Sequence, residues 1–167
     1  MKLDAEDLPH LVVTSCLEVH RRLGLGLPAL AYREGLAVEL TQREILFERD
    51  RPFVVSYGDT MIETGEVIDF IVEDLVLLSI VARDETGQLE KEQVNARLRS
   101  TGKGIGFLVN FHKADLRQGI RRMMIGSSAP EVPYTREQGV RGLSRPASLP
   151  PRKPRPEEAG EEELSAG

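Results

Sequence analysis

The sequence contains no tryptophan, a single cysteine and few aromatic residues of any kind. Aromatic residues make up 5% of the 167 residues, whereas charged residues make up 29%, so a folded core has to be built from aliphatic side chains. The single cysteine, Cys16, excludes an internal disulfide framework and a zinc site made of cysteines. We therefore expect a cytoplasmic protein in which Cys16 is a small core residue.

The sequence also lacks a long apolar run and an excess of positive charge. No segment approaches the roughly 20 apolar residues with which a helix crosses a bilayer. The first ten residues, MKLDAEDLPH, carry acids where a signal peptide needs an apolar stretch. The formal net charge of -5 argues against broad attraction to nucleic acid or to an anionic membrane surface. We expect neither export nor a membrane partner.

A change in composition divides the sequence near residue 126. Residues 127–167 contain seven of the ten prolines and end in a basic run followed by an acidic one, RKPRPEEAGEEE. Such a segment has too few apolar side chains to bury a core. We predict a folded domain over residues 1–126 and a disordered, proline-rich, charged tail over residues 127–167. The tail holds six basic and seven acidic residues, so -4 of the net charge of -5 belongs to the domain.

Two apolar runs meet at Glu73 and Asp74 in the stretch VIDFIVEDLVLLSIVA, residues 67–82. Each run has the length and composition of a buried strand, and the acidic pair between them suits a tight turn. This stretch predicts a hairpin at the centre of a sheet. Asp69 interrupts the first run, and a buried carboxylate is costly unless it is paired, hydrogen-bonded or bound to a metal. Asp69 is therefore the first candidate site residue.

The remaining elements are read from the spacing of apolar residues. Helical spacing predicts helices over residues 8–23, 28–43 and 89–100. In the first two we expect Leu23 and Leu30 to face the core. Strands are predicted over residues 45–48, 53–57 and 105–111, with another from residue 60 into the central hairpin, whereas residues 116–125 fit either a helix or a strand. The order predicts an α/β (α+β) fold with helices on a central mixed β-sheet.

The segment LEVHRRLGLGLPALAY, residues 17–32, resembles the signature of the GxxExxY family. These are small bacterial and archaeal proteins of the PD-(D/E)xK nuclease superfamily. The matching residues are Glu18, Val19, His20, Arg21, Leu23, Gly24, Gly26 and Tyr32. Ala29 stands where the glutamate that names the family is expected. The resemblance continues through IDFIVED and EQVNARLRSTGKGIGFLVNF and covers roughly residues 8–125.

The resemblance implies a metal-dependent phosphodiesterase site. In this superfamily one central strand supplies an aspartate and the next supplies Glu-x-Lys. The carboxylates hold Mg²⁺ beside the scissile phosphate, and the lysine helps to activate water. Asp69 matches the aspartate. An ungapped alignment of the two strands places Ser79 at the glutamate and Val81 at the lysine.

The catalytic motif is therefore degenerate. Side chains expected for catalysis are missing at Ala29, Ser79 and Val81. The remnants of the site are Asp69, Glu18 and, at the helix glutamine of the family, Gln93. Serine is a poor Mg²⁺ ligand, and valine can neither transfer a proton nor stabilise an anion. We expect an inactive member that needs no cofactor and acts as a binding or regulatory module.

Two other interpretations stay open. In the first, the chain is an active Mg²⁺-dependent nuclease with a rearranged site. Asp69 and Glu18 would be the metal ligands, and candidates for a recruited residue are Arg83, Glu85 and Glu90. In the second, the chain is a purely structural protein-interaction module. The partner could be a protein, nucleic acid or a second copy of the chain. An exposed apolar patch would favour a protein, and a basic groove beside Asp69 would favour nucleic acid.

For an inactive site we expect structural roles. Asp69 would be a relic carboxylate that is hydrogen-bonded to the backbone or to Gln93. Tyr32 would pack in the core with a hydrogen-bonded hydroxyl. The three histidines are too scattered in sequence to predict a zinc site.

Overall fold

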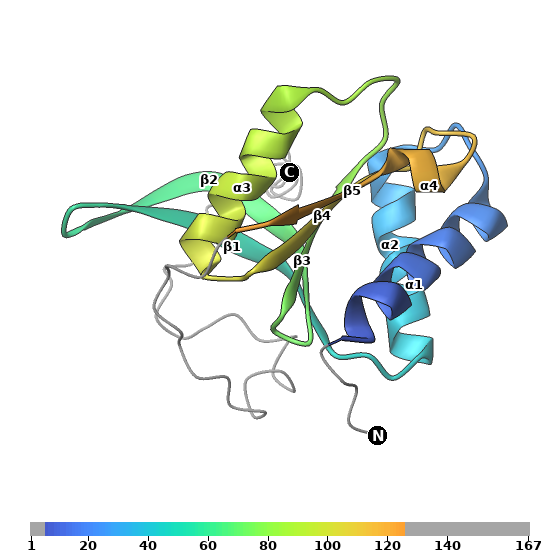
Figure 1. Ribbon diagram of the computed structural model, residues 1–167, viewed down its shortest axis with the longest axis horizontal. Helices are drawn as coiled ribbons and strands as arrows, with labels where there is room; N and C mark the ends of the chain where they lie inside the picture. The colour runs from blue at the N-terminus through green and yellow to red at the C-terminus, as the bar shows by residue number, and fades with distance from the viewer. Residues whose placement is uncertain (1–5, 126–167) are drawn as a thin grey trace, which may run out of the picture.

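The computed structural model describes residues 6–125, which form a five-stranded sheet with helices on both faces (Figure 1). The helices are α1 (Leu8–Leu23), α2 (Ala29–Gln42), α3 (Gln88–Thr101) and the short α4 (Leu116–Gly119). The strands are β1 (Phe47–Tyr57), β2 (Thr60–Val72), β3 (Val76–Val81), β4 (Ile105–Asn110) and β5 (Ile120–Met124). This is the predicted α/β arrangement. The predicted disordered tail lies outside the described residues.

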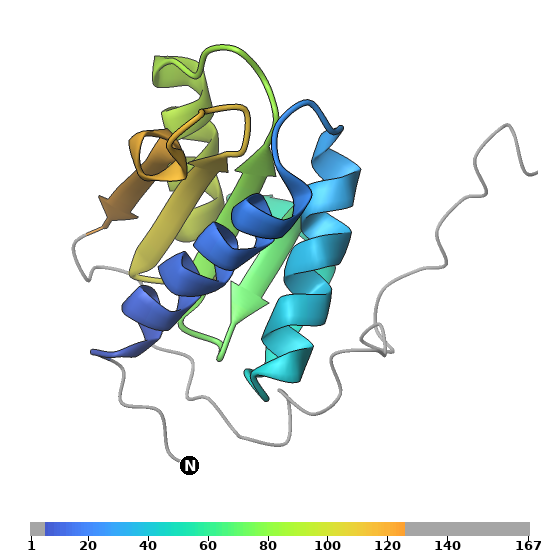
Figure 2. The ribbon, with the colours of Figure 1, turned by 90° about the vertical axis from the view of Figure 1, so that its right-hand side faces the viewer.

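The sheet is mixed, with the strands in the order β1-β2-β3-β4-β5. β1, β2 and β3 are antiparallel neighbours, β3 and β4 are parallel, and β5 is antiparallel to β4. Parallel strands need a crossover connection, which α3 provides between β3 and β4. Figure 2 shows α1 and α2 side by side on one face of the sheet and α3 on the other. The predicted central hairpin, β2-β3, therefore lies between two helical layers.

The turn of this hairpin lies at the predicted acidic pair. Glu73 and Asp74 both have positive φ, 49° and 57°, which is uncommon outside glycine. Contacts from both sides hold them there. The Glu73 carboxylate accepts a hydrogen bond from the Leu46 backbone N–H at 2.8 Å, and Lys103 Nζ donates to Asp74 Oδ1 at 2.7 Å.

The core lies on both faces of the sheet. Under α1 and α2 it includes the fully buried Tyr32, Leu36, Leu40 and Phe70, and under α3 it includes Val94, Leu98, Ile71 and Leu108. Cys16 is buried as predicted, and burial raises the pKa of its thiol to about 12. The expectations for Leu23 and Leu30 are wrong, because these side chains are 40% and 59% exposed. Leu23 ends α1 and Leu30 lies in the first turn of α2, where Tyr32 faces the core instead.

Strand β1 is continuous, whereas two separate strands were predicted. Pro52 lies within β1, which tolerates it because β1 is an edge strand and the register shifts between Pro52 and Val54. Strand β2 likewise continues through Gly65, whose φ is 79°. The resulting β1-β2 hairpin is long and extends away from the rest of the sheet (Figure 1).

Helix α3 fastens the hairpin near its base. Ser100 Oγ donates a hydrogen bond to the Val54 carbonyl at 2.7 Å, and Arg97 pairs with Glu66 at 2.7 Å. The Arg97 guanidinium also lies 4.8 Å from the centre of the Phe53 ring. The outer part of the hairpin, towards Tyr57 and Thr60, is exposed.

The segment 116–125, for which the sequence fitted either a helix or a strand, contains one of each. The short helix α4 leads directly into β5. Gly119 is buried at the junction, and a Cβ there would lie 2.3 Å from the Asn110 carbonyl oxygen, so only glycine fits. Within residues 6–125, no helix combines the length and the apolar character needed to cross a membrane.

Candidate functional site

Asp69 lies where strands β2 and β3 separate. The last pair of their ladder is Phe70 with Leu78. Asp69 is the residue before Phe70 in β2, and its Oδ2 accepts a hydrogen bond from the Ile80 backbone N–H at 2.7 Å. The side chain therefore satisfies a backbone donor for which the ladder no longer supplies a carbonyl. This is the predicted backbone bond, whereas Gln93 is an exposed residue of α3.

A second partner of Asp69 comes from α2. Arg33 Nε lies 3.4 Å from Asp69 Oδ1, and the same guanidinium donates a hydrogen bond to Asp50 Oδ1. Asp50 is in β1, between the register pairs Arg49–Phe70 and Arg51–Ile68, and so it lies across from Asp69. Arg33 thus connects two carboxylates of neighbouring strands.

Sequence reasoning missed Arg33 and Asp50. Arg33 directly follows Tyr32, one of the residues that carry the family resemblance. This adjacency was the only feature of the sequence that could have pointed to Arg33. Asp50 belongs to the run ERDR, which is typical of the solvated surface of a strand. Only the antiparallel register of β1 and β2 brings it to Asp69.

The Asp69 carboxyl is largely shielded from solvent, with 16% of its side chain exposed. Burial raises its pKa above the ordinary value, while the Ile80 N–H and the positive charges of Arg33 and Arg97 act in the opposite direction. The net direction is upward because removing a carboxylate from water penalises its charged form. The ion pairs around Asp69 and Asp50 extend towards the surface. Arg49 Nε lies 3.3 Å from Asp50 Oδ2, and the Arg49 guanidinium also pairs with Glu34.

Ser79 and Val81 lie on β3 at alternate positions with Leu77, on the face that α3 covers. Both are partly buried, and Val81 packs against the cluster that contains Val94 and Leu98. The position aligned with the catalytic lysine is therefore part of the aliphatic core. The position aligned with the glutamate carries a hydroxyl.

Comparison with protein-family models gives a match to the PD-(D/E)XK nuclease superfamily over residues 6–123, which is more than half of the chain. The chain belongs to the PD-(D/E)XK nuclease superfamily. Its mixed sheet and flanking helices agree with this assignment. No significant match was found among the curated proteins or the solved structures.

The residues at this PD-(D/E)XK site do not fit a bound Mg²⁺. Mg²⁺ is usually held by one or two carboxylates whose oxygens are free to coordinate it, but Asp69 Oδ2 accepts from the Ile80 N–H and Oδ1 faces the Arg33 guanidinium. Among residues 6–125 there is no group of three acidic, histidine or cysteine side chains arranged to hold a metal ion. The guanidinium of Arg33 adds positive charge beside Asp69.

The carboxylate of Glu18, the second metal candidate, is hydrogen-bonded by arginines of the same helix, α1. Arg21 donates to both carboxylate oxygens, at 2.9 and 2.7 Å, and Arg22 donates to Oε1 at 2.5 Å. The hydrogen bonds from Arg21 and Arg22 lower the pKa of Glu18 to about 2. Glu18 is thus a surface carboxylate in an arginine cluster.

The residues considered for recruitment have other partners. Arg83 pairs with Glu90 Oε1 at 2.9 Å, and Glu90 Oε2 accepts from the Gly87 backbone N–H at the start of α3 at 2.7 Å. Glu85 lies 3.3 Å from Lys113 Nζ. These contacts place Glu90 in a helix cap and leave Arg83 and Glu85 in surface ion pairs.

The signature residue Tyr32 has a structural role, as predicted. Its hydroxyl donates to the Gly24 carbonyl at 2.7 Å and accepts from the Leu27 backbone N–H at 3.2 Å. Its ring stacks on Phe111 with a centroid distance of 4.5 Å, and His112 Nε2 lies 2.8 Å from the Leu27 carbonyl oxygen. Tyr32 and His112 therefore fasten the α1-α2 connection to the end of β4. Ala29 is the first residue of α2.

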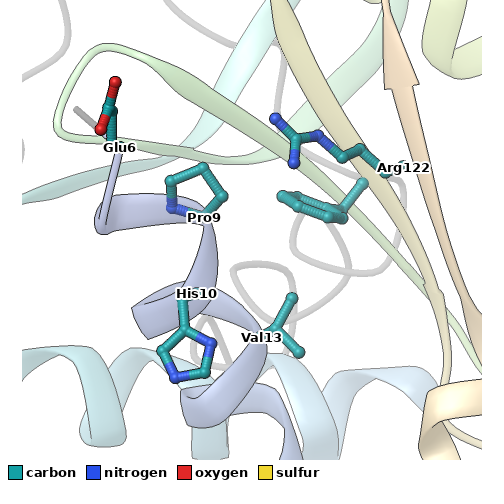
Figure 3. A pocket seen from close by; sticks show the side chains of 6 residues that line it. Glu6, Pro9, His10, Val13 and Arg122 are labelled. Atoms are coloured by element: carbon teal, nitrogen blue, oxygen red, sulfur yellow. The ribbon is translucent and has the colours of Figure 1, made fainter.

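A shallow depression lies elsewhere, between the start of α1 and strands β4 and β5 (Figure 3). Its volume is about 290 Å³. Its lining residues are Glu6, Pro9, His10, Val13, Phe107 and Arg122. It shares no residue with the cluster around Asp69.

Proposed function

We propose that this chain is a GxxExxY-type member of the PD-(D/E)XK superfamily that has lost phosphodiester hydrolysis. It acts without a metal cofactor, as a cytoplasmic binding or regulatory module. The observation that carries this proposal is the engagement of the Asp69 carboxylate by Ile80 and Arg33. Ser79 and Val81 supply neither the second carboxylate nor the lysine that the reaction of the superfamily requires.

The outer β1-β2 hairpin supports a protein as the partner. Tyr57, Met61 and Ile62 are 80%, 67% and 44% exposed. Val55 pairs with Ile62 and Tyr57 pairs with Thr60, so Tyr57 and Ile62 share a face with Val55. Val55 in turn packs against the α3 side of the core. An apolar surface thus continues from the core onto the hairpin.

The charge of the hairpin supports the same choice. Residues 53–67 contain three acidic residues, Asp59, Glu63 and Glu66, and no basic residue. A phosphate backbone requires positive charge on the protein. A protein segment that carries apolar and basic side chains fits this surface better than nucleic acid does.

A cleavage assay tests the loss of hydrolysis. Wild type and Asp69→Ala are incubated with single- and double-stranded DNA and RNA in Mg²⁺ and in Mn²⁺, after circular dichroism has shown that both are folded. We expect no cleavage above that of the variant. Cleavage by wild type that disappears in Asp69→Ala would contradict the proposal and would support a rearranged active site.

Binding is measured on the same samples. We expect no increase in fluorescence anisotropy of labelled DNA or RNA on addition of the wild type at physiological salt. Light scattering determines whether a second copy of the chain is the partner. Salt-sensitive binding of nucleic acid that tolerates changes in the hairpin would contradict the choice of a protein partner.

A further inference from the structure

Asp50 and Asp69 form a carboxylate pair that needs a positive charge. They lie opposite one another on neighbouring antiparallel strands, and directly opposed like charges destabilise a sheet. Asp69 is only 16% exposed, so water screens this repulsion poorly. The resemblance of Asp69 to the motif aspartate implies that an active nuclease of the superfamily holds a divalent cation beside this residue. Here the charge comes from the chain itself.

Arg33 is placed to neutralise both carboxylates. Its guanidinium donates to Asp50 Oδ1 and its Nε lies 3.4 Å from Asp69 Oδ1. The Nε atom is buried and makes no well-aligned hydrogen bond within the described part of the chain. Its interaction with Asp69 is therefore mainly one of charge. A guanidinium stays protonated at every physiological pH, so the charge is permanent.

We propose that Arg33 is a built-in cation that supplies, beside Asp69, the positive charge that a divalent metal supplies in the superfamily. The positive charge that other members obtain from solution is supplied here by α2. As a result, the fork between β2 and β3 is stable in the apo protein. This inference goes beyond the proposed function because it concerns what holds the former catalytic site together, whatever the domain binds.

Thermal unfolding of the full-length chain, with EDTA and with millimolar Mg²⁺ or Mn²⁺, tests this proposal. We expect the Tm of wild type to be the same in all three conditions. Arg33→Met, which keeps the length of the side chain and removes its charge, should lower Tm in EDTA by at least about 5 °C. The largely buried Asp69 carboxylate loses its positively charged partner, while the more exposed Asp50 keeps only Arg49. Mn²⁺ should recover part of that loss by binding to the exposed carboxylate pair.

Matched variants separate charge from packing. Arg33→Lys retains a positive charge and should lie between wild type and Arg33→Met. Arg51→Met removes an exposed arginine of β1 that lies 3.8 Å from Glu48, and its Tm should stay within about 2 °C of wild type. If Arg33→Met does not fold, the neutral triple variant Arg33→Met/Asp50→Asn/Asp69→Asn should fold, since no unpaired charge remains.

Two results would overturn the proposal. One is a wild-type Tm that Mn²⁺ raises and that Asp69→Asn makes insensitive to Mn²⁺, because the carboxylates would then hold a metal beside Arg33. The other is an Arg33→Met variant as stable as wild type, or a triple variant that fails to fold although Arg51→Met folds. Neither result depends on whether a partner is found, so this test and the test of the proposed function are distinguishable.

Discussion

Asp69 Oδ2 lies 2.7 Å from the backbone nitrogen of Ile80, across the point where strands β2 and β3 diverge. In this chain the carboxylate therefore continues the hydrogen-bonding pattern of the sheet. The contribution of Asp69 to the free energy of unfolding can therefore be measured by substitution.

Asp69→Ala should destabilise the domain by about 1–3 kcal/mol, because it leaves the Ile80 N–H without its acceptor and removes a partner of Arg33. Urea denaturation followed by circular dichroism measures this change. Ser79→Ala, two positions along β3 from Val81, is the control and should change stability by less than about 1 kcal/mol. Equal effects of the two substitutions would contradict the role assigned to Asp69.

The stability difference between wild type and Asp69→Asn should depend on pH. Burial raises the pKa of Asp69 in the folded state, so the folded protein holds this proton more tightly than the unfolded chain does. The stabilisation is fully present below the unfolded pKa and is lost as pH rises through the folded pKa. Wild type should therefore lose stability relative to Asp69→Asn as pH rises from the ordinary aspartate pKa. Urea titrations of both proteins over this range measure the difference, and a difference that grows in favour of wild type with rising pH would contradict the raised pKa.

Tyr32→Phe should loosen the connection between α1 and α2. The substitution removes the hydrogen bonds of the hydroxyl to Gly24 and Leu27 and keeps the stacked ring. We expect a loss of about 1–2 kcal/mol and faster amide hydrogen exchange in residues 24–27. Tyr57→Phe is the control, because Tyr57 is 80% exposed. Unchanged exchange in Tyr32→Phe would show that the hydroxyl does not hold this loop.

The hairpin surface should be needed for partner binding and dispensable for folding. The triple variant Tyr57→Thr/Met61→Thr/Ile62→Thr replaces exposed side chains with a residue that suits strands, so its Tm should stay within about 3 °C of wild type. A photo-crosslinking amino acid at position 57 should capture a protein in cells, and Ile62→Thr, on the same face as position 57, should reduce that yield. Position 99, on the exposed side of α3, serves as the control site. Equal crosslinking from both positions, or crosslinks to nucleic acid, would contradict the proposed partner.

The parts of the fold that follow from local pattern could be predicted from the sequence. The apolar runs around Glu73 and Asp74 predicted the central hairpin, which the structure shows. The alignment that places Ser79 and Val81 at the glutamate and lysine positions stays a prediction. The pairing of Arg33 with Asp50 and Asp69 could not be predicted, because it depends on how α2 packs and on the register of β1. The continuity of β1 through Pro52 was also missed. A proline is disfavoured inside a sheet, and only the edge position of β1 removes that penalty.

The contacts at the base of the β1-β2 hairpin have a mechanical consequence. Ser100 and Arg97 attach Val54 and Glu66 to α3, and α3 also packs on the strand that carries Val81. The hairpin is thus held at its base by α3, while its outer part lies in solvent. We therefore expect a displacement of the hairpin at Tyr57 to strain the contacts of Val54 and Glu66 with α3.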